Sequence, residues 1–352
     1  MRAARDSWVN PALALLLCAA VGAAFAGLRM PLPWMTGPLL AMAACNFAGA
    51  ELRSPPGARA VGQIIIGTAL GLYFTPMVGR EVSAHWWLLI AAAAVAIFLG
   101  VLGGWVLSRA SGVDAKTAFF ASVPGGAVEM AILGERFHAR VDRIALAQSL
   151  RVLIVVIAVP FAMTYSGAHG ADTYAQVAVP LRWQGLATLL AVGSVAALLL
   201  ARLRMPNAFF FGPLATTIAL TVNGVELSSL PTALTSPAQM LLGCALGARF
   251  ERRSLESAPR YVSAVLASVL VALLVSAGFG WAIGVAAGVS VPSMILAMAP
   301  GGIAEMCITA KVLQLGVPLV TAAHVLRVLV LIVTTGPVFR AARAVRARLA
   351  NG

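Results

Sequence analysis

The stretch Pro124-Gly125-Gly126-Ala127-Val128-Glu129-Met130 returns later in the chain as Pro300-Gly301-Gly302-Ile303-Ala304-Glu305-Met306. Both copies lie inside long apolar segments. Proline and paired glycines break helices, and an ionised carboxylate is costly in hydrocarbon. A broken, charged motif that occurs twice in an otherwise apolar chain therefore predicts a functional site.

The composition is that of an integral membrane protein. Of the 352 residues, 61% are hydrophobic and only 11% are charged, and the mean hydropathy is +0.93; soluble domains are roughly half apolar and a quarter charged. The net charge of +13 is spread between the apolar segments, which is typical of basic residues flanking membrane helices and not of a nucleic-acid-binding face. The four cysteines stand apart in apolar surroundings without CxxC spacing, so we expect neither a disulfide nor a metal framework. We also expect no cofactor.

Further matches between the two halves predict a tandem duplication. The spacing between partners is nearly constant along the chain. The matched pairs are Arg29-Met30-Pro31 with Arg204-Met205-Pro206, Gln63 to Gly71 with Gln239 to Gly247, and Leu150-Arg151-Val152-Leu153 with Leu326-Arg327-Val328-Leu329.

The duplication sets the expected boundaries. We predict a membrane repeat 1 over residues 11–165, a linker over 166–184, a membrane repeat 2 over 185–340 and a basic cytoplasmic tail over 341–352. The segment 11–28 resembles a cleavable signal peptide, but its Arg-Met-Pro end has a counterpart in the second half. We therefore expect this segment to be a retained helix.

Each half contains six apolar segments long enough to be considered as membrane helices. They cover approximately 11–28, 33–50, 60–79, 86–107, 117–134 and 144–165 in the first half, and 186–201, 207–225, 233–248, 262–286, 291–310 and 317–339 in the second.

The distribution of Lys and Arg selects among the topologies. If all twelve segments cross, the halves are parallel and the basic residues divide almost evenly between the two sides. If the Pro-Gly-Gly segment of each half enters and leaves on one side, most basic residues fall on the side of the N-terminus. A non-crossing fourth segment also gives a good division, but those segments are the most apolar. We therefore predict an all-α polytopic membrane protein with inverted 5+5 transmembrane helices, an interrupted or re-entrant segment in each half, and both termini in the cytoplasm.

The carboxylates of the repeated motif are the first candidate binding groups. Gly125–Gly126 and Gly301–Gly302 can unwind the backbone, which would place Glu129 and Glu305 in the first turn of a restarted helix. Exposed amide groups and the helix dipole favour a carboxylate there, so each Glu could simply cap its half-helix. In the functional interpretation, the two interrupted helices meet near the midplane from opposite sides, and they form a transporter's binding site.

Two arginines are the second candidate pair. Arg151 and Arg327 lie far from the ends of apolar segments, about 12–15 Å deep at 1.5 Å per residue. Such a side chain should face the protein interior and have a partner, for which Glu129 and Glu305 are the obvious choices. The pair could fix helix packing, or it could neutralise an anionic substrate or alternate with a proton on Glu.

His324 completes the candidate set, because it stands one helical turn before Arg327, where the first half has Gln148. Histidine titrates near neutral pH and could relay a proton, or it could only donate a hydrogen bond in a polar core. The GxxxG spacings Gly67/Gly71 and Gly243/Gly247 predict close helix packing. Catalytic motifs such as HExxH, GxSxG or a Walker loop are missing from the sequence, so we do not expect an enzyme.

At these residues the chain resembles the AbrB family of bacterial integral membrane proteins, whose members carry this duplicated domain. The resemblance rests on Arg29-Met30-Pro31 through Gly37-Pro38, both Pro-Gly-Gly-x-x-Glu-Met blocks and the Leu-Arg-Val-Leu helices, and covers almost all of the chain. The family carries labels as an ammonia monooxygenase and as a regulator of gene expression. A copper monooxygenase should show clustered histidines, whereas only His324 lies in an apolar segment here. No extramembrane stretch is long enough to bind DNA directly.

Two functions from different classes follow. The first is a secondary transporter of a small solute with a central site at the two interrupted helices, coupled to protons or sodium. The second is a membrane-embedded regulator or sensor that affects gene expression through a partner. We favour the transporter, in the bacterial inner membrane, with the lipid bilayer and an unidentified small molecule or ion as partners. A homo-oligomer is left open, and no direct contact with nucleic acid is expected.

Overall fold

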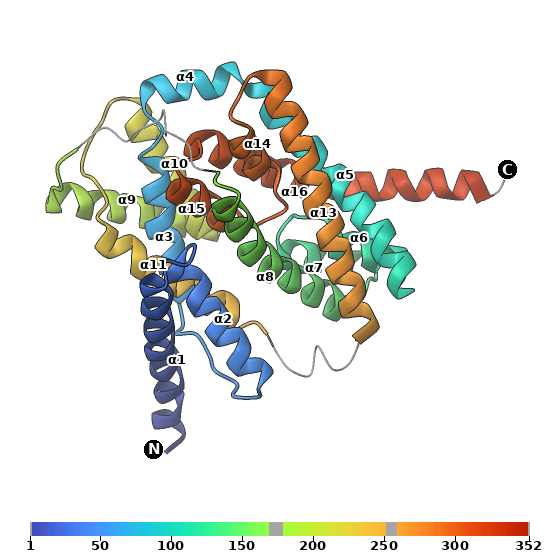
Figure 1. Cartoon of the computed structure of the whole chain (residues 1–352), viewed down its shortest axis with the longest axis horizontal. Helices are drawn as coiled ribbons and strands as arrows, with labels where there is room; N and C mark the ends of the chain where they lie inside the picture. Colours follow the sequence, from blue (N-terminus) through green and yellow to red (C-terminus); the bar gives the residue numbers. More distant parts are fainter. Residues whose placement is uncertain (1, 169–178, 251–258, 351–352) are drawn as a thin grey trace. The chain divides into compact units, whose positions relative to one another are not determined.

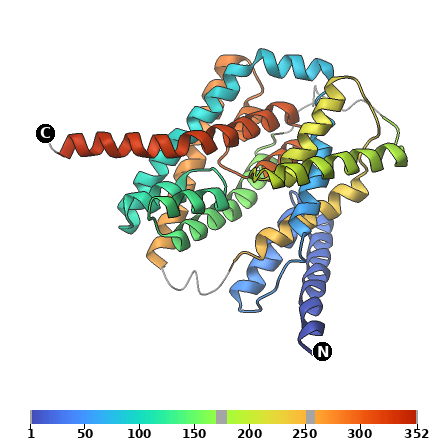
Figure 2. The same cartoon turned by 180° about the vertical axis from the view of Figure 1, so that it is seen from behind.

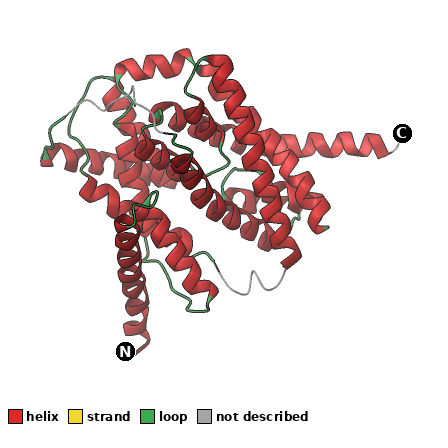
Figure 3. Cartoon of the chain, in the orientation of Figure 1, coloured by secondary structure: helices red, strands yellow, loops and turns green. Residues whose placement is uncertain are grey.

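The computed structural model is all-helical. It describes residues 2–168, 179–250 and 259–350, and the side chains of 10–168, 179–250 and 259–341. Within these ranges the chain forms 15 helices joined by loops and turns, with no strand (Figure 3). The predicted all-α class is therefore confirmed.

The length and apolar composition of several helices make this a multi-pass membrane protein. Six described helices can cross a membrane, and a bent pair makes a possible seventh. The six are α1 (Arg2–Gly27), α5 (Trp86–Ser111), α8 (Val141–Tyr165), α9 (Trp183–Arg202), α13 (Pro259–Ala287) and α16 (Val317–Ala350). The bent pair is α3 (Ala58–Gly71) with α4 (Pro76–Ala84), which meet at 88°.

The remaining helices are shorter than a span. The expected segment 60–79 is divided between α3 and α4, because the chain turns after Gly71 and Pro76 starts a new helix. Helices α2 (Pro33–Phe47), α10 (Ala208–Val222) and α11 (Thr232–Gly247) have 15, 15 and 16 residues, or about 22–24 Å at 1.5 Å per residue.

The chain divides into two compact units, and each unit takes residues from both halves of the sequence. The first consists of Met1–Ala84, Val156–Glu256 and Cys307–Pro318, and the second of His85–Val155, Ser257–Met306 and Leu319–Gly352. The two repeats, the linker and the tail stay predictions. The linker lies partly outside the described residues, as do the side chains of the tail beyond residue 341.

In the first unit, glycines let helices pack closely. Helix α2 packs against α1 and α11, and α3 packs against α10 and α11 (Figure 1). A methyl group added at Gly67 or Gly71 would collide with α10, and one at Gly243 or Gly247 would collide with α2. The GxxxG spacings therefore have the packing role expected from the sequence.

The Arg-Met-Pro sequences of the first unit end a helix in the same way. Arg29 follows α1 with φ 54°, and Arg204 follows α9 with φ 57°. The next residues close the turn, since the amide of Met30 donates to the carbonyl of Phe25. A left-handed residue after the helix end, followed by proline, is a common stop signal.

The second unit is built on α5 and α13, which pack against each other (Figures 1 and 2). Helix α6 (Ala115–Ser122) packs on α5, and α14 (Val291–Met298) packs on α13. The close approach again uses glycines, with Gly104 against the backbone of α6 and Gly280 against that of α14. The breaks that follow α6 and α14 are therefore held against α5 and α13.

Candidate functional site

Both Pro-Gly-Gly segments interrupt a helix. Helix α6 ends before Val123–Gly126, and the chain resumes as α7 (Ala127–Arg136). Helix α14 ends before Ala299–Gly302, and the chain resumes as α15 (Ile303–Leu313). All nine residues predicted for the site lie in the second unit.

The spacing within the motif has a steric reason. A methyl group added at Gly126 would collide with the carboxylate of Glu129, and one at Gly302 would collide with that of Glu305. The first glycine of each pair lies against the methionine side chain that ends the motif. Gly126 also has a φ of 97°, which side chains rarely allow. The two glycines, the glutamate and the methionine therefore form one packed unit at each break.

Each glutamate folds back over the break that precedes it. Glu129 and Glu305 are the third residues of α7 and α15, next to the free amides of the first turn. A carboxylate at this position is stabilised by those amides and by the helix dipole. Glu129 is half-buried, whereas Glu305 is only 8% exposed. The geometry fits the capping role considered from the sequence.

Arg151 and Gln148 bind the chain at the start of the first break, where α6 ends. Gln148 Nε2 donates to the carbonyls of Phe120, Ala121 and Val123 at 3.0, 3.2 and 2.9 Å. Arg151 Nη1 donates to the carbonyl of Val123 at 3.0 Å. The last carbonyls of a helix have no helical partner, and a cation there complements the dipole. These two side chains of α8 therefore cap the C-terminus of α6.

The second arginine does the same at the second break. Arg327 Nη1 and Nη2 donate to the carbonyls of Ala299 and Gly301, both at 2.6 Å. His324 Nε2 lies 3.0 Å from the carbonyl of Leu296. His324 and Arg327 are 0% and 1% exposed. The hydrogen bonds seen for the arginines thus go to main-chain carbonyls, whereas the sequence had suggested carboxylate partners.

An electrostatic interaction joins the two halves of the sequence. The carboxylate of Glu305 acts on the guanidinium of Arg151. Arg151 is only 5% exposed, and a buried charge is strongly stabilised by a nearby opposite charge. Candidate residues that are far apart in the chain therefore lie in one region of the second unit.

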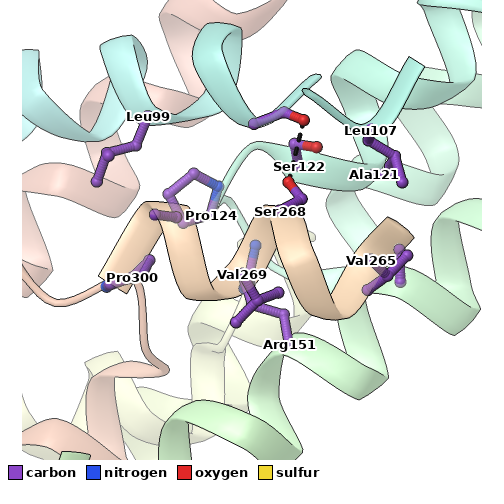
Figure 4. A pocket seen from close by; sticks show the side chains of 13 residues that line it. Leu99, Leu107, Ala121, Ser122, Pro124, Arg151, Val265, Ser268, Val269 and Pro300 are labelled. Atoms are coloured by element: carbon purple, nitrogen blue, oxygen red, sulfur yellow. Dashed lines mark hydrogen bonds between the residues drawn. The ribbon is translucent and has the colours of Figure 1, made fainter. Parts of the chain in front are cut away.

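The two breaks reach a common cavity of about 20 Å³ (Figure 4), which is enough for a water molecule or a small ion. Pro124 and Pro300 both line it, one from each motif, together with Arg151. Ser268 Oγ donates to the carbonyl of Gly103 across one wall, at 3.0 Å. The other lining residues are Leu99, Leu107, Ala121, Ser122, Ala147, Val265, Val269 and Ala272.

Some lining residues have no signal in the sequence. Ser122 and Ser268 carry the polar atoms of the wall beside Arg151, yet serines in apolar helices are common and neither belongs to the motif. Only the packing of α13 on α5 brings Ser268 to the site. Over the described residues, no group of three or more His, Cys, Asp or Glu is placed to hold a metal ion.

The part of the chain that matches known proteins is nearly the same as the part that contains the duplicated sequence. The family model described as "Transition state regulatory protein AbrB" matches residues 34–343. "Putative regulator AbrB" of Escherichia coli (strain K12) is 26% identical over 316 residues, 89% of this chain and 90% of that protein. "Uncharacterized protein YhjN" of Bacillus subtilis (strain 168) is 27% identical over 301 residues, 80% of this chain and 77% of that protein. With a family match over most of its length and the membrane helices described above, the chain belongs to the AbrB family of membrane proteins.

Proposed function

We propose that this protein is a secondary transporter that moves a small solute by alternating access through the cavity at the two helix breaks. The observation that carries the proposal is that Pro124 and Pro300, one from each broken helix, line one cavity with the buried Arg151. Irregular backbone is tolerated at membrane depth only where it is buried in protein or lines a cavity. Matching interruptions in two halves are typical of a transporter's binding site.

The proposal includes the inverted arrangement. Ten crossings, five per half, require α2, α3, α10 and α11 to cross in addition to the six long helices. They would put both termini in the cytoplasm of a bacterial cell, with the protein in the inner membrane. Cysteines introduced at Ser111, Arg140, Glu226 and Gln314 test this with an impermeant thiol reagent. The inverted topology requires labelling of the first two positions from inside and of the last two from outside. Labelling of Ser111 and Arg140 from opposite sides would favour twelve crossings.

The charged groups have assigned roles in this proposal. Glu129 and Glu305, at the restarted helices, take up and release a proton or bind sodium as the solute moves. Arg151 balances the charge at the cavity, and Arg327 holds the second break together. The protein acts as a transporter without enzymatic activity or a bound cofactor.

Transport can be tested with the purified protein in liposomes under an imposed pH or sodium gradient. A screen of small solutes should find one whose uptake depends on the gradient. Glu129→Gln and Glu305→Gln keep the shape of the side chain and should lower that uptake at least ~10-fold, the scale of 1.4 kcal/mol in the barrier. Glu226→Gln, which changes an exposed residue of the first unit, is the matched control. Uptake unchanged in both motif variants would show that the assignment is wrong.

A regulator or sensor is the second candidate, because the family model and the E. coli relative are both named as regulators. In that case the same cavity binds a ligand, and a cytoplasmic partner docks on the basic segments. Ligand-dependent thermal stabilisation without any flux would support this function. Flux of the same ligand in liposomes, with no change in transcription when the gene is deleted, would count against it.

A further inference from the structure

We infer that the cavity is an anion site, in which Arg151 and Ser122 bind a small monovalent anion or the carboxylate end of a small solute. The inference rests on the proposed function and names the class of ligand for the same site. Three independent features carry it: the unpartnered atoms of the wall, the balance of buried charge, and the size of the cavity.

The unpartnered atoms of the wall are hydrogen-bond donors. Arg151 is 95% buried and donates from Nη1 to Val123, but its Nε has no hydrogen-bond partner among the described residues. The Oγ of Ser122 is likewise without one in this part of the chain. A guanidinium can only donate, and a hydroxyl can rotate to donate. An acceptor bound in the cavity that both residues line would satisfy the two groups.

Two main-chain acceptors near the cavity already receive hydrogen bonds. The carbonyl of Val123 accepts from Gln148 and Arg151, and the carbonyl of Gly103 accepts from Ser268. The unpartnered acceptor nearby, Oε1 of Gln148, belongs to a residue outside the lining. A cation in the cavity would thus meet the guanidinium of Arg151, whereas an anion would meet the donors of Arg151 and Ser122.

The buried charges favour the same sign. The charged residues of the second unit that are described as buried are Arg151, Arg327 and Glu305, which leaves an excess of one positive charge. Glu129 is only half-buried, and neither glutamate lines the cavity. Pro124 and Pro300 place the cavity between the C-termini of α6 and α14 and the N-termini of α7 and α15, so the negative and positive ends of these helix dipoles oppose each other there and the sign is set by the side chains. Apolar walls strengthen all of these interactions.

The small volume limits the ligand. About 20 Å³ holds one or two waters or a halide-sized ion. A larger solute fits this state only if a single carboxylate enters the cavity. A free inorganic anion and the carboxylate of a larger solute are both monovalent anionic groups. The choice of probe distinguishes between them.

Binding is tested apart from transport, by thermal unfolding of the purified full-length chain in detergent. The probes are sodium chloride, nitrate, formate and acetate against sodium gluconate at constant ionic strength, with potassium replacing sodium as the cation control. We expect a saturable rise in melting temperature with the anion and none with the cation. A response to chloride or nitrate indicates a free inorganic anion, and a response restricted to formate and acetate indicates a carboxylate group. A response to cations alone, or to no probe, overturns the inference.

Single substitutions test whether the anion binds at this cavity. Arg151→Gln should weaken the apparent affinity at least ~10-fold, and Ser122→Ala by a smaller factor of ~3–10, in line with a charge-assisted and a neutral hydrogen bond. Gly103→Ala should also abolish the response, because its methyl group would lie 3.1 Å from Ser268 Oγ and 3.2 Å from Ser122 Cβ and fill the cavity. Arg136→Gln removes the same charge from an exposed position and is the control.

The outcomes separate the inference from the proposed function. If Arg151→Gln does not fold, Ser122→Ala and Gly103→Ala still decide, and an unchanged anion response in both overturns the site. Saturable anion binding without flux of any solute leaves the anion site standing and removes the transporter. Solute flux without any anion response leaves the transporter standing and removes the anion site.

Discussion

The first break, between α6 and α7, and the second, between α14 and α15, have the same sequence frame but are closed to different degrees. At the first, Arg151 donates one hydrogen bond and lines the cavity. At the second, Arg327 donates to two carbonyls and is 1% exposed. Glu129 is half-buried, whereas Glu305 is buried. Under the proposed function, the second break is mainly a structural anchor, whereas the first presents Arg151 and Ser122 to the ligand.

The largest contrast should be in stability. Arg327→Gln leaves the carbonyls of Ala299 and Gly301 without their donors, which should cost about 2–5 kcal/mol. Arg151→Gln removes one such bond and should cost about 1–3 kcal/mol, with a larger effect on ligand binding. Thermal unfolding of both purified variants checks the order. Equal losses, or a larger loss for Arg151→Gln, would remove the distinction between anchor and ligand site.

The glycines give the next contrast. Gly126→Ala combines a collision with Glu129 and a φ of 97°, and the backbone strain alone is worth about 1–3 kcal/mol. Gly302→Ala collides with the carboxylate of Glu305, a flexible group that can move aside. Gly126→Ala should therefore destabilise the protein more than Gly302→Ala in the same unfolding assay. The reverse order would mean that the position of Glu305 is the more rigid constraint.

Gln148 and His324 stand three residues before Arg151 and Arg327. Replacing each with the other's residue type should change stability less than the substitutions above. Gln148→His would lose part of a set of three carbonyl bonds, at a cost of about 1–2 kcal/mol. His324→Gln replaces a single contact with Leu296 and should be nearly neutral. The pH profile of uptake tests the alternative role, because His324→Gln leaves the profile unchanged if the histidine only holds the second break. A profile that loses a titration near neutral pH would instead make His324 a proton carrier.

The smallest expected difference in stability is at the N-terminal caps of α6 and α14. Asp114 accepts from the amide of Thr117 at 3.0 Å and from its hydroxyl at 2.7 Å, whereas Ser290 makes no such cap bond to α14. Asp114→Ala should cost about 1 kcal/mol, and Ser290→Ala less, because Ser290 only accepts a hydrogen bond from the hydroxyl of Ser293 and caps no amide of α14. Equal costs in thermal unfolding would show that the Asp114 cap adds no stability.

The cap of α6 also predicts a pH dependence. Burial acts to raise the pKa of Asp114, but the hydrogen bonds from Thr117, with the charge and amide of Lys116, together hold the pKa below its usual value. A lowered folded-state pKa stabilises the protein fully above the unfolded value of about 3.9 and loses that contribution as the pH falls through the folded value. The stability difference between wild type and Asp114→Ala should therefore shrink below about pH 4. A difference that is constant with pH would contradict the charged cap.

The sequence was sufficient to predict the broken helices, because proline and paired glycines interrupt a helix wherever they occur together in apolar sequence. It also placed Arg151 and Arg327 in the interior. It did not identify the carbonyls that these arginines bind, although every helix break leaves such carbonyls free. Ser268 could not be found either, because only the packing of α13 on α5 brings it to the cavity. The mixing of both halves in each unit is likewise a result of tertiary packing that local patterns do not contain.

Thiol labelling shows whether the cavity at the two helix breaks opens to each side of the membrane in turn. A single cysteine is placed at Ser122, in the cavity wall, or at the corresponding Met298, which is 1% exposed, in a chain whose four cysteines are replaced. An impermeant reagent is applied to each side, with and without an imposed anion gradient. We predict that Ser122→Cys is labelled from one side in one condition and from the other side in the second, and that Met298→Cys stays unlabelled. Labelling of Ser122→Cys from neither side, or from the same side throughout, would rule out alternating access through this cavity.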